Sequence, residues 1–326
     1  MSKYKVYISD FDYGDNDVEK SILEPIGAEV IGLYCKTGEG LAEQAKDADA
    51  IIQQYAKIPR ETIEKLENCK IIARYGIGVD ILDVQACYDN GMIVTNVPDY
   101  CLDEVADHAI TLSFCLMRNI PWYDKAVKNG EYKWQSWRAP IPRFRDATFG
   151  IIGFGRIAQN MTKKLLAFGA RVIAYDPFVS GSFMATVGAE KVELDEIFKR
   201  AHAINVLCPY NEYTHHIVNE RTLGLMRNDA YLVCVSRGKC VDNIALYNAL
   251  VNQQIIGAAL DDLEEEPMKM EGWTPNINPL TKLDNCIITP HIAYVSAGSL
   301  EECRRVAAEN VKAVLLGKKP FDIVKP

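Results

Sequence analysis

The chain has 326 residues, of which 48% are hydrophobic and 25% charged, and its formal net charge is −8. These values are ordinary for a globular protein, and the length suggests two domains of roughly 100–200 residues each. The acidic balance and the lack of a basic block argue against binding to nucleic acid or to an anionic membrane surface.

The ten cysteines are scattered along the chain and form no C-x-x-C pair. This pattern is typical of reduced thiols, and it predicts neither a disulfide framework nor a zinc site. The chain enters a strand-like run at once, without a signal peptide, and no apolar run approaches the roughly 18 residues of a membrane span. We therefore expect a soluble, cytoplasmic protein.

In the first hundred residues, short β-type runs alternate with helix-like segments. The runs are residues 5–9, 28–33, 50–53, 70–74 and 92–96, and the helices are expected at 17–25, 40–46, 60–68 and 83–90. Such alternation predicts a doubly wound parallel sheet. No phosphate-binding glycine fingerprint follows its first strand.

Two further helices are expected before the middle of the chain, at 101–120 and 122–129. They lead into residues 131–142, EYKWQSWRAPIP, which are rich in aromatic residues, arginine and proline. We expect a loop or arm here. Its aromatic side chains, with Trp134 and Trp137 among them, could cover a domain or subunit interface or pack on the surface, and the sequence does not choose between these.

The stretch from Thr148 to Asp176 has the pattern of a dinucleotide-binding βαβ unit. Gly153, Gly155 and Ala158 follow an apolar run in G-x-G-x-x-A spacing. The first glycine allows a tight turn, the second lets the backbone approach a pyrophosphate, and the small third residue lets helix and strand pack closely. Asp176, after the next apolar run, can bind the ribose hydroxyls and repel a 2′-phosphate, which favours NAD over NADP. The alternative is a tight turn without a ligand.

The following segments predict a second doubly wound domain. Strands are expected at 149–152, 172–175, 203–208, 230–236, 256–260 and 286–289, with helices at 193–200, 219–226 and 242–252. Ligands of such sheets bind at the carboxyl ends of the strands. The ends of interest are Gly153, Asp176, Pro209, Arg237, Asp261 and His291. Residues 296–316 form an amphipathic helix.

Arg237, Glu266 and His291 lie just past apolar strands and suffice for hydride transfer to a carbonyl. The arginine can polarise the carbonyl and hold a carboxylate, the histidine can transfer the hydroxyl proton, and the glutamate can orient the histidine. The alternatives are a structural histidine, a surface arginine and solvated acids at 264–266. His108 is expected to be a hydrogen-bonded core histidine. His215 and His216 lack an acid or cysteine nearby in sequence, so no metal site is predicted.

Several ordered motifs resemble the D-isomer-specific 2-hydroxyacid dehydrogenase family over nearly the whole chain. They are RYGIGVD (74–80), NVPDYCLDEVADHA (96–109), GIIGFGRIA (150–158), YDP (175–177), VSRGKCVD (235–242), GAALDDLEEEP (257–267) and ITPHIAYVS (288–296). Within the family the chain looks most like the C-terminal binding protein branch, through NVPDYC, YDPFVS, NEYTHHIVN and Tyr294. It departs from the common A-R-G-G pattern at Lys239, and Asp262-Leu263 replace an aromatic residue or valine.

The resemblance implies a homodimer with a discontinuous, flavodoxin-like substrate domain of residues 1–100 and 295–326. A Rossmann NAD-binding domain, residues 101–294, would be inserted in it, with the active site in the cleft. The implied activity is NAD-dependent interconversion of a small 2-oxo acid and the D-2-hydroxy acid. The alternatives are an NADH-sensing, corepressor-like interaction protein, or a short-form phosphoglycerate dehydrogenase, the weaker rival because no regulatory domain follows residue 326.

The resemblance also implies roles for single residues. Arg237, Glu266 and His291 would be catalytic. Substrate would contact the main chain of Ile77 and Gly78 and the side chains of Arg74, Arg237 and Tyr294. Asp261 would hold the nicotinamide carboxamide. The full set of expected NAD contacts is Gly153, Gly155, Arg156, Ile157, Asp176, Pro177, Cys208, Pro209, Thr214, Val235, Ser236, Asp261 and His291. Tyr294 and the tryptophan-rich arm favour a substrate larger and more apolar than glyoxylate.

Overall fold

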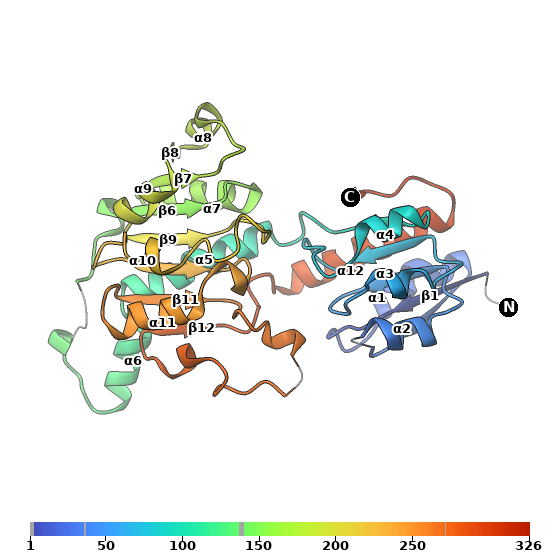
Figure 1. Cartoon of the computed structure of the whole chain (residues 1–326), viewed down its shortest axis with the longest axis horizontal. Helices are drawn as coiled ribbons and strands as arrows, with labels where there is room; N and C mark the ends of the chain where they lie inside the picture. Colours follow the sequence, from blue (N-terminus) through green and yellow to red (C-terminus); the bar gives the residue numbers. More distant parts are fainter. Residues whose placement is uncertain (1–2, 36, 137–139, 271) are drawn as a thin grey trace. The chain divides into compact units, whose positions relative to one another are not determined.

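The computed structural model describes residues 3–35, 37–136, 140–270 and 272–326. Within these ranges the chain forms two compact units, each with its own parallel sheet and covering helices (Figure 1). Unit 1 combines the chain up to Cys101 with Val295–Pro326, and unit 2 is Leu102–Tyr294. In Figure 1, unit 1 is blue to cyan with the red C-terminal segment, and unit 2 runs from teal to orange.

The sheet of unit 1 has five parallel strands in the order β2-β1-β3-β4-β5. Their bounds are β1 Tyr4–Ile8, β2 Ala28–Gly32, β3 Ala50–Gln53, β4 Ile71–Arg74 and β5 Ile93–Thr95. This is the strand order of flavodoxin-like folds, so the fold class predicted for this part of the chain is confirmed.

Both faces of this sheet are covered by helices, because successive strand residues point to opposite sides. Val6 and Ile8 pack into one buried cluster with residues of α1 and α12, whereas Tyr7 packs into another with residues of α2, α3 and α4. The helix bounds are α1 Asp17–Leu23, α2 Gly38–Gln44, α3 Arg60–Ile63, α4 Val84–Asp89 and α12 Ala297–Leu315.

A buried ion pair ties the C-terminal helix to the start of the chain. Arg304 on α12 donates from Nε and Nη2 to the Glu19 carboxylate on α1, at 2.9 and 2.8 Å. The Tyr75 hydroxyl, just after β4, donates to the same carboxylate at 2.7 Å. Burial and the adjacent Glu19 charge raise the pKa of Tyr75 well above its usual value. Since a buried charge needs a partner, this network fixes three segments that are distant in sequence.

The sheet of unit 2 has seven parallel strands in the order β12-β11-β10-β9-β6-β7-β8. Their bounds are β6 Thr148–Ile152, β7 Arg171–Tyr175, β8 Glu190–Lys191, β9 Ala203–Val206, β10 Tyr231–Cys234, β11 Gly257–Leu260 and β12 Cys286–Ile288. Counted from β6, this is the Rossmann order extended by one strand, as predicted, and it reverses direction between β6 and β9. The carboxyl ends of all seven strands share one edge.

Helices of unit 2 lie on both faces of its sheet. Residues of α9, α10 and α11 join strand residues in one large buried cluster, and α5 packs against α7 and the strands β10 and β11. The bounds are α5 Leu102–Met117, α6 Ile120–Lys128, α7 Arg156–Ala167, α8 Gly181–Val187, α9 Leu194–Arg200, α10 Glu220–Leu223 and α11 Asn243–Val251. In the part of the chain that the structure describes, no helix is both long and apolar enough to cross a membrane.

The sequence analysis missed two elements and made two helices too long, one of them at 219–226, where α10 spans only Glu220–Leu223. It gave no signal for α8 or for β8, which has two residues, both exposed, at the sheet edge. A strand this short and exposed has no apolar alternation to detect. The helix expected at 60–68 is wrong in length, since α3 ends at Ile63 and the chain continues in turns.

Candidate active site

The glycine loop follows β6 and is held close to the neighbouring strand β9. Gly153 adopts a φ of +89°, and a Cβ there would lie 2.7 Å from the Cys208 main chain. Its N–H donates to the Tyr175 carbonyl at 2.8 Å. No larger residue fits this turn.

The start of α7 suits a phosphate. Gly155 is its N-cap, and as a glycine it has no side chain that could cap the first turn of the helix. A Cβ on Gly155 would meet no atom within 4 Å, so the backbone is open to a ligand. Arg156 and Ile157 begin the helix, and Ala158 is buried against the sheet. Uncapped N–H groups and the helix dipole favour an anion here.

The other predicted NAD contacts follow the next strands along the same edge. Cys208 and Pro209 come after β9, and the Thr214 hydroxyl donates to the Pro209 carbonyl at 2.7 Å. Val235 and Ser236 come after β10, and Asp176 and Pro177 after β7. The hydrogen bond with Cys240, together with burial, raises the pKa of Cys208, so this thiol stays protonated.

The backbone directly after Arg237 lies very close to the backbone of the acidic loop that follows β11. A Cβ on Gly238 would overlap the Leu263 carbonyl group, so only glycine permits this approach. Arg237 itself is half-buried and donates from Nη1 to the Ser236 carbonyl at 3.0 Å. The arginine is thereby fixed next to the acidic loop.

The His291 loop is organised by the buried carboxylate of Asp261. That carboxylate accepts hydrogen bonds from the N–H groups of Ile292 and Ala293 at 3.0 and 2.9 Å, and from the Thr289 hydroxyl. His291 has a φ of +55° and donates its N–H to the Asp261 carbonyl at 2.6 Å. His108 lies 3.0 Å from the Thr289 hydroxyl through Nε2, so it is hydrogen-bonded as predicted, but it is only partly buried and not a core residue.

Every acid of the segment 261–266 has its own partner. The pairs are Asp261 with the His291 loop, Asp262 with His291, Glu264 with His216, Glu265 with Asn278 and Glu266 with Lys239. The reading of 264–266 as solvated loop acids is therefore wrong: these side chains are partly buried and bonded.

His216 has an acid partner that its sequence neighbourhood does not show. Its Nε2 lies 2.6 Å from Glu264 Oε1, and Glu264 also accepts from the Asn243 N–H at 3.3 Å. The two residues are far apart along the chain, so only the fold reveals the pair. Within the described residues, no three His, Cys, Asp or Glu side chains are grouped so that they could hold a metal ion.

The two groups expected to act together, Glu266 and His291, are each paired with a different residue. Lys239 Nζ donates to Glu266 Oε2 at 2.7 Å. His291 Nδ1 lies 3.3 Å from Asp262 Oδ2. Asp262 and Lys239 are two of the departures from the family pattern, and the sequence analysis assigned neither of them a role. That both residues depart from the family pattern was the one feature of the sequence that could have pointed to these pairs. Tyr294 lies edge-on to His291, with ring centroids 6.1 Å apart.

The residues predicted to meet the substrate carboxylate form a loop in unit 1, after β4. Gly76 has a φ of +126°, and its carbonyl accepts from Val97 N–H at 3.0 Å. The Ile77 carbonyl accepts from the Asn96 amide at 2.8 Å. Among the described residues, none accepts the N–H of Ile77 or Gly78. Arg74 donates to the Tyr75 carbonyl. The loop therefore presents main-chain donors suited to a carboxylate.

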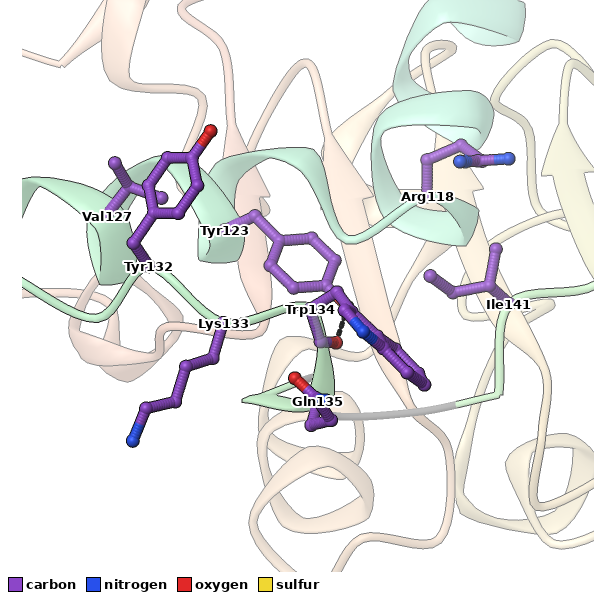
Figure 2. A pocket seen from close by; sticks show the side chains of 8 residues that line it. All are labelled: Arg118, Tyr123, Val127, Tyr132, Lys133, Trp134, Gln135 and Ile141. Carbon is purple, nitrogen blue, oxygen red and sulfur yellow. Dashed lines mark hydrogen bonds between the residues drawn. The ribbon is translucent and has the colours of Figure 1, made fainter.

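A pocket of about 780 Å³ lies between α6 and the described part of the aromatic arm in unit 2. Figure 2 shows the side chains that line it. The Tyr123 hydroxyl on α6 donates to the Trp134 carbonyl at 3.1 Å. The side chains of Tyr132 and Trp134 are 88% and 75% exposed. None of the predicted catalytic or cofactor residues lines this pocket. Trp137, the other tryptophan of the arm, lies outside the described residues.

Residues 110–293 match the sequence model of the family described as D-isomer specific 2-hydroxyacid dehydrogenase, NAD binding domain. The chain belongs to this dehydrogenase family. The predicted family, oxidoreductase class and NAD-binding domain are thereby confirmed. The likeness to the C-terminal binding protein branch stays a prediction from the sequence.

Two curated relatives and one solved structure illustrate the likeness. The D-3-phosphoglycerate dehydrogenase of Methanocaldococcus jannaschii is 38% identical over 305 residues, which are 93% of this chain but only 56% of that protein. The glyoxylate reductase of Korarchaeum cryptofilum is 33% identical over 87% of this chain and 85% of its own. The D-lactate dehydrogenase of Aquifex aeolicus, solved with NAD and lactic acid, has a TM-score of 0.84 and 29% identity, with 96% of each chain covered.

Asp176 is the residue expected to set the preference of this dehydrogenase for NAD. Its carboxylate accepts from the N–H groups of Phe154 and Phe178 at 2.8 and 2.9 Å, which holds it beside the glycine loop. Asp176→Asn keeps one acceptor for the loop and removes the charge. We expect the ratio of kcat/KM for NADH over NADPH to fall about tenfold or more, since hydrogen bonds to charged groups contribute about 1.5–3 kcal/mol.

Asp195→Asn is the matched control for this prediction. It removes the same charge from unit 2, where Asp195 pairs with Arg221 on the exposed surface. The control is expected to leave the cofactor ratio unchanged. An unchanged ratio in Asp176→Asn as well would refute the role given to Asp176.

Proposed function

We propose that this protein is an NAD-dependent oxidoreductase that interconverts a small 2-oxo acid and the corresponding D-2-hydroxy acid. One observation carries the proposal. Arg237, the acids at 261–266 and His291 follow three adjacent strands, β10, β11 and β12, at the carboxyl edge of a Rossmann sheet. The glycine loop follows β6 at the same edge. Ligands of such sheets bind there, so a cofactor and these groups share one side of unit 2.

The chemistry of the residues fits this reaction. NADH, when bound, supplies the hydride that C2 of the substrate accepts. Arg237 would hold the substrate carboxylate through paired N–H groups and polarise the carbonyl. His291 would give a proton to the carbonyl oxygen during reduction and take it back during oxidation. No metal is required, because the arginine supplies the positive charge near the developing alkoxide.

The cofactor and substrate roles of the remaining residues are part of the same proposal. The turn at Gly153 and the open backbone at Gly155 would take the pyrophosphate, and Asp176 the ribose. In unit 1, the N–H groups of Ile77 and Gly78 would bind the substrate carboxylate, with Arg74 nearby in sequence. Asp261 would reach the nicotinamide carboxamide in addition to holding the His291 loop.

Phosphoglycerate dehydrogenase activity is the second candidate. The relative from M. jannaschii supports it, since 93% of this chain aligns with that protein at 38% identity. Glyoxylate reductases align over a similar share, which supports a smaller substrate. The two candidates share one mechanism and differ only in the group attached to C2.

The test is an assay of the purified full chain with NADH and a panel of 2-oxo acids. The panel comprises glyoxylate, pyruvate, 3-phosphohydroxypyruvate and branched or aromatic 2-oxo acids. The highest kcat/KM identifies the substrate class, and a preference for larger apolar acids would agree with Tyr294 near His291. Tight NADH binding without turnover of any acid, together with capture of a peptide, would instead favour the NADH-sensing interaction protein.

We propose in addition that the protein is a homodimer whose contact includes the aromatic arm. The support is the exposure of Tyr132 and Trp134 beside the pocket of Figure 2, because large exposed aromatic groups are typical of interfaces. Light scattering is expected to give twice the chain mass of 36.5 kDa. Trp134→Ser is expected to shift the protein toward the monomer, and a stable dimer in that variant would contradict the arm contact.

A further inference from the structure

We propose that Asp262 is a positioning residue for His291, and that Lys239 holds the neighbouring Glu266. This inference rests on the proposed function, since it assigns how the acid/base histidine of that reaction is oriented. Asp262 Oδ2 lies 3.3 Å from His291 Nδ1. A carboxylate at Nδ1 fixes the proton there and leaves Nε2 as the nitrogen that exchanges a proton with the substrate.

The orientation of the Asp262 carboxylate is fixed by its own backbone. Its Oδ1 accepts the N–H of Leu263 at 3.0 Å, so the second oxygen is the one that faces the ring. The distance of 3.3 Å is long for a hydrogen bond, but such contacts often tighten only when the substrate is bound. The structure places the two groups at ion-pair distance, with the Asp262 oxygen on the Nδ1 side of the ring.

The contact between Asp262 and His291 matters because the carboxylate is buried. The side chain of Asp262 is 6% exposed, and that of His291 is 27% exposed. A buried carboxylate is costly unless a donor or a positive charge compensates it. Of the residues that the structure describes, the ion-pair partner of Asp262 is His291. His291 is thus the described group that is placed to compensate the buried Asp262 carboxylate.

Lys239 changes the environment of Glu266. Its Nζ donates to Glu266 Oε2 at 2.7 Å, and the Glu266 side chain is only 18% exposed. A lysine at this distance compensates the negative charge of the glutamate, which weakens the effect of that charge on other groups. Asp262 has no such cation among the described residues except the histidine itself. The charge that acts on His291 most directly is then that of Asp262.

The other titratable groups on the elements around His291 are already engaged. The Asp261 carboxylate binds the loop at 289–293, and His108 from α5 lies 3.5 Å from it. Tyr294 is in edge contact with the ring. Arg237 follows β10, which lies two strands away from β12 in the sheet, and Glu266 is held by Lys239. Asp262 is the acid among these that contacts the histidine side chain.

The test measures kcat/KM against pH for reduction of a 2-oxo acid and for oxidation of the D-2-hydroxy acid. Reduction needs a protonated His291 and falls as the pH rises, whereas oxidation needs a neutral ring and rises. Asp262→Asn removes a negative charge 3.3 Å from the ring nitrogen, and it is therefore expected to move both midpoints to lower pH. At neutral pH, its kcat for reduction should fall about tenfold or more with little change in KM.

Three further variants separate charge, position and loop effects. Asp262→Glu keeps the charge, so the midpoints should stay near those of the wild type while kcat falls. Glu265→Gln removes a charge from the same loop, where Glu265 binds Asn278, and should leave both midpoints unchanged. Glu266→Gln should move the midpoints less than Asp262→Asn, because Lys239 already compensates Glu266.

The proposal would be overturned if a folded Asp262→Asn variant kept the midpoints of the wild-type pH profiles while Glu266→Gln shifted them. If Asp262→Asn does not fold, ¹⁵N spectra of the wild-type protein with labelled histidine decide. The His291 signals, assigned by their loss in His291→Asn, should show the Nδ1–H tautomer of the neutral ring, and the Nε2–H tautomer would contradict the proposal. Failure of the wild-type protein to reduce any 2-oxo acid counts against the proposed function alone, since the tautomer is still measurable.

Discussion

His291→Asn is expected to lower the turnover of 2-oxo acids about a thousandfold while the affinity for NADH persists. Positioned acid/base groups contribute about 10²–10⁴-fold, and asparagine fills similar space without a titrating nitrogen. The His291 main chain would still donate to the Asp261 carbonyl, so the loop should keep its form. Stopped-flow or steady-state turnover and the quenching of protein fluorescence by NADH measure the two quantities separately.

His216→Asn is the matched control for this variant. His216 is also paired with an acid, Glu264, in the same unit, but that pair joins the start of α11 rather than the His291 loop. We expect turnover close to that of the wild type in this control, with some loss of thermal stability. Turnover within a few-fold of the wild type in His291→Asn would refute the acid/base role and the proposed mechanism with it.

Much of the fold could be predicted because the buried strands are short apolar runs at regular intervals. The runs that became β3, β6 and β11 consist mostly of apolar residues, and each is followed by a polar residue or a glycine turn. Alternation with helices then leaves a parallel, doubly wound arrangement as the simplest packing. The edge strand β8 was missed because its two residues are exposed and charged.

The strand ends that carry the candidate site could also be predicted, whereas the pairing of their side chains could not. Parallel topology alone places Arg237, Asp261 and His291 at one edge. Which acid reaches which base depends on loop conformations, such as the positive φ of Glu266 and His291. The close approach of Gly238 to Leu263 is likewise a tertiary contact without a local signal. Asp262 stood out only as a departure from the family pattern.

Arg237→Met is expected to weaken strongly the preference of the enzyme for a 2-oxo acid over its neutral methyl ester. The ester keeps the carbonyl that accepts the hydride but lacks the negative charge that a guanidinium binds through paired N–H groups. We expect kcat/KM for the acid to fall about a thousandfold, with a much smaller loss for the ester. Arg237→Lys should give an intermediate loss, because a lysine offers a point charge without the planar fork.

The ratio of kcat/KM for the acid to kcat/KM for the ester also separates two sources of carboxylate recognition. Arg237 on the one hand, and the N–H groups of Ile77 and Gly78 on the other, are each proposed to bind the carboxylate. Main-chain donors survive any side-chain substitution, so the preference they contribute would persist in Arg237→Met. A ratio near that of the wild type would assign recognition of the carboxylate to the loop after β4 and leave Arg237 with polarisation of the carbonyl. A ratio near one would instead place that recognition on the arginine, whose position next to the acidic loop depends on the glycine at 238.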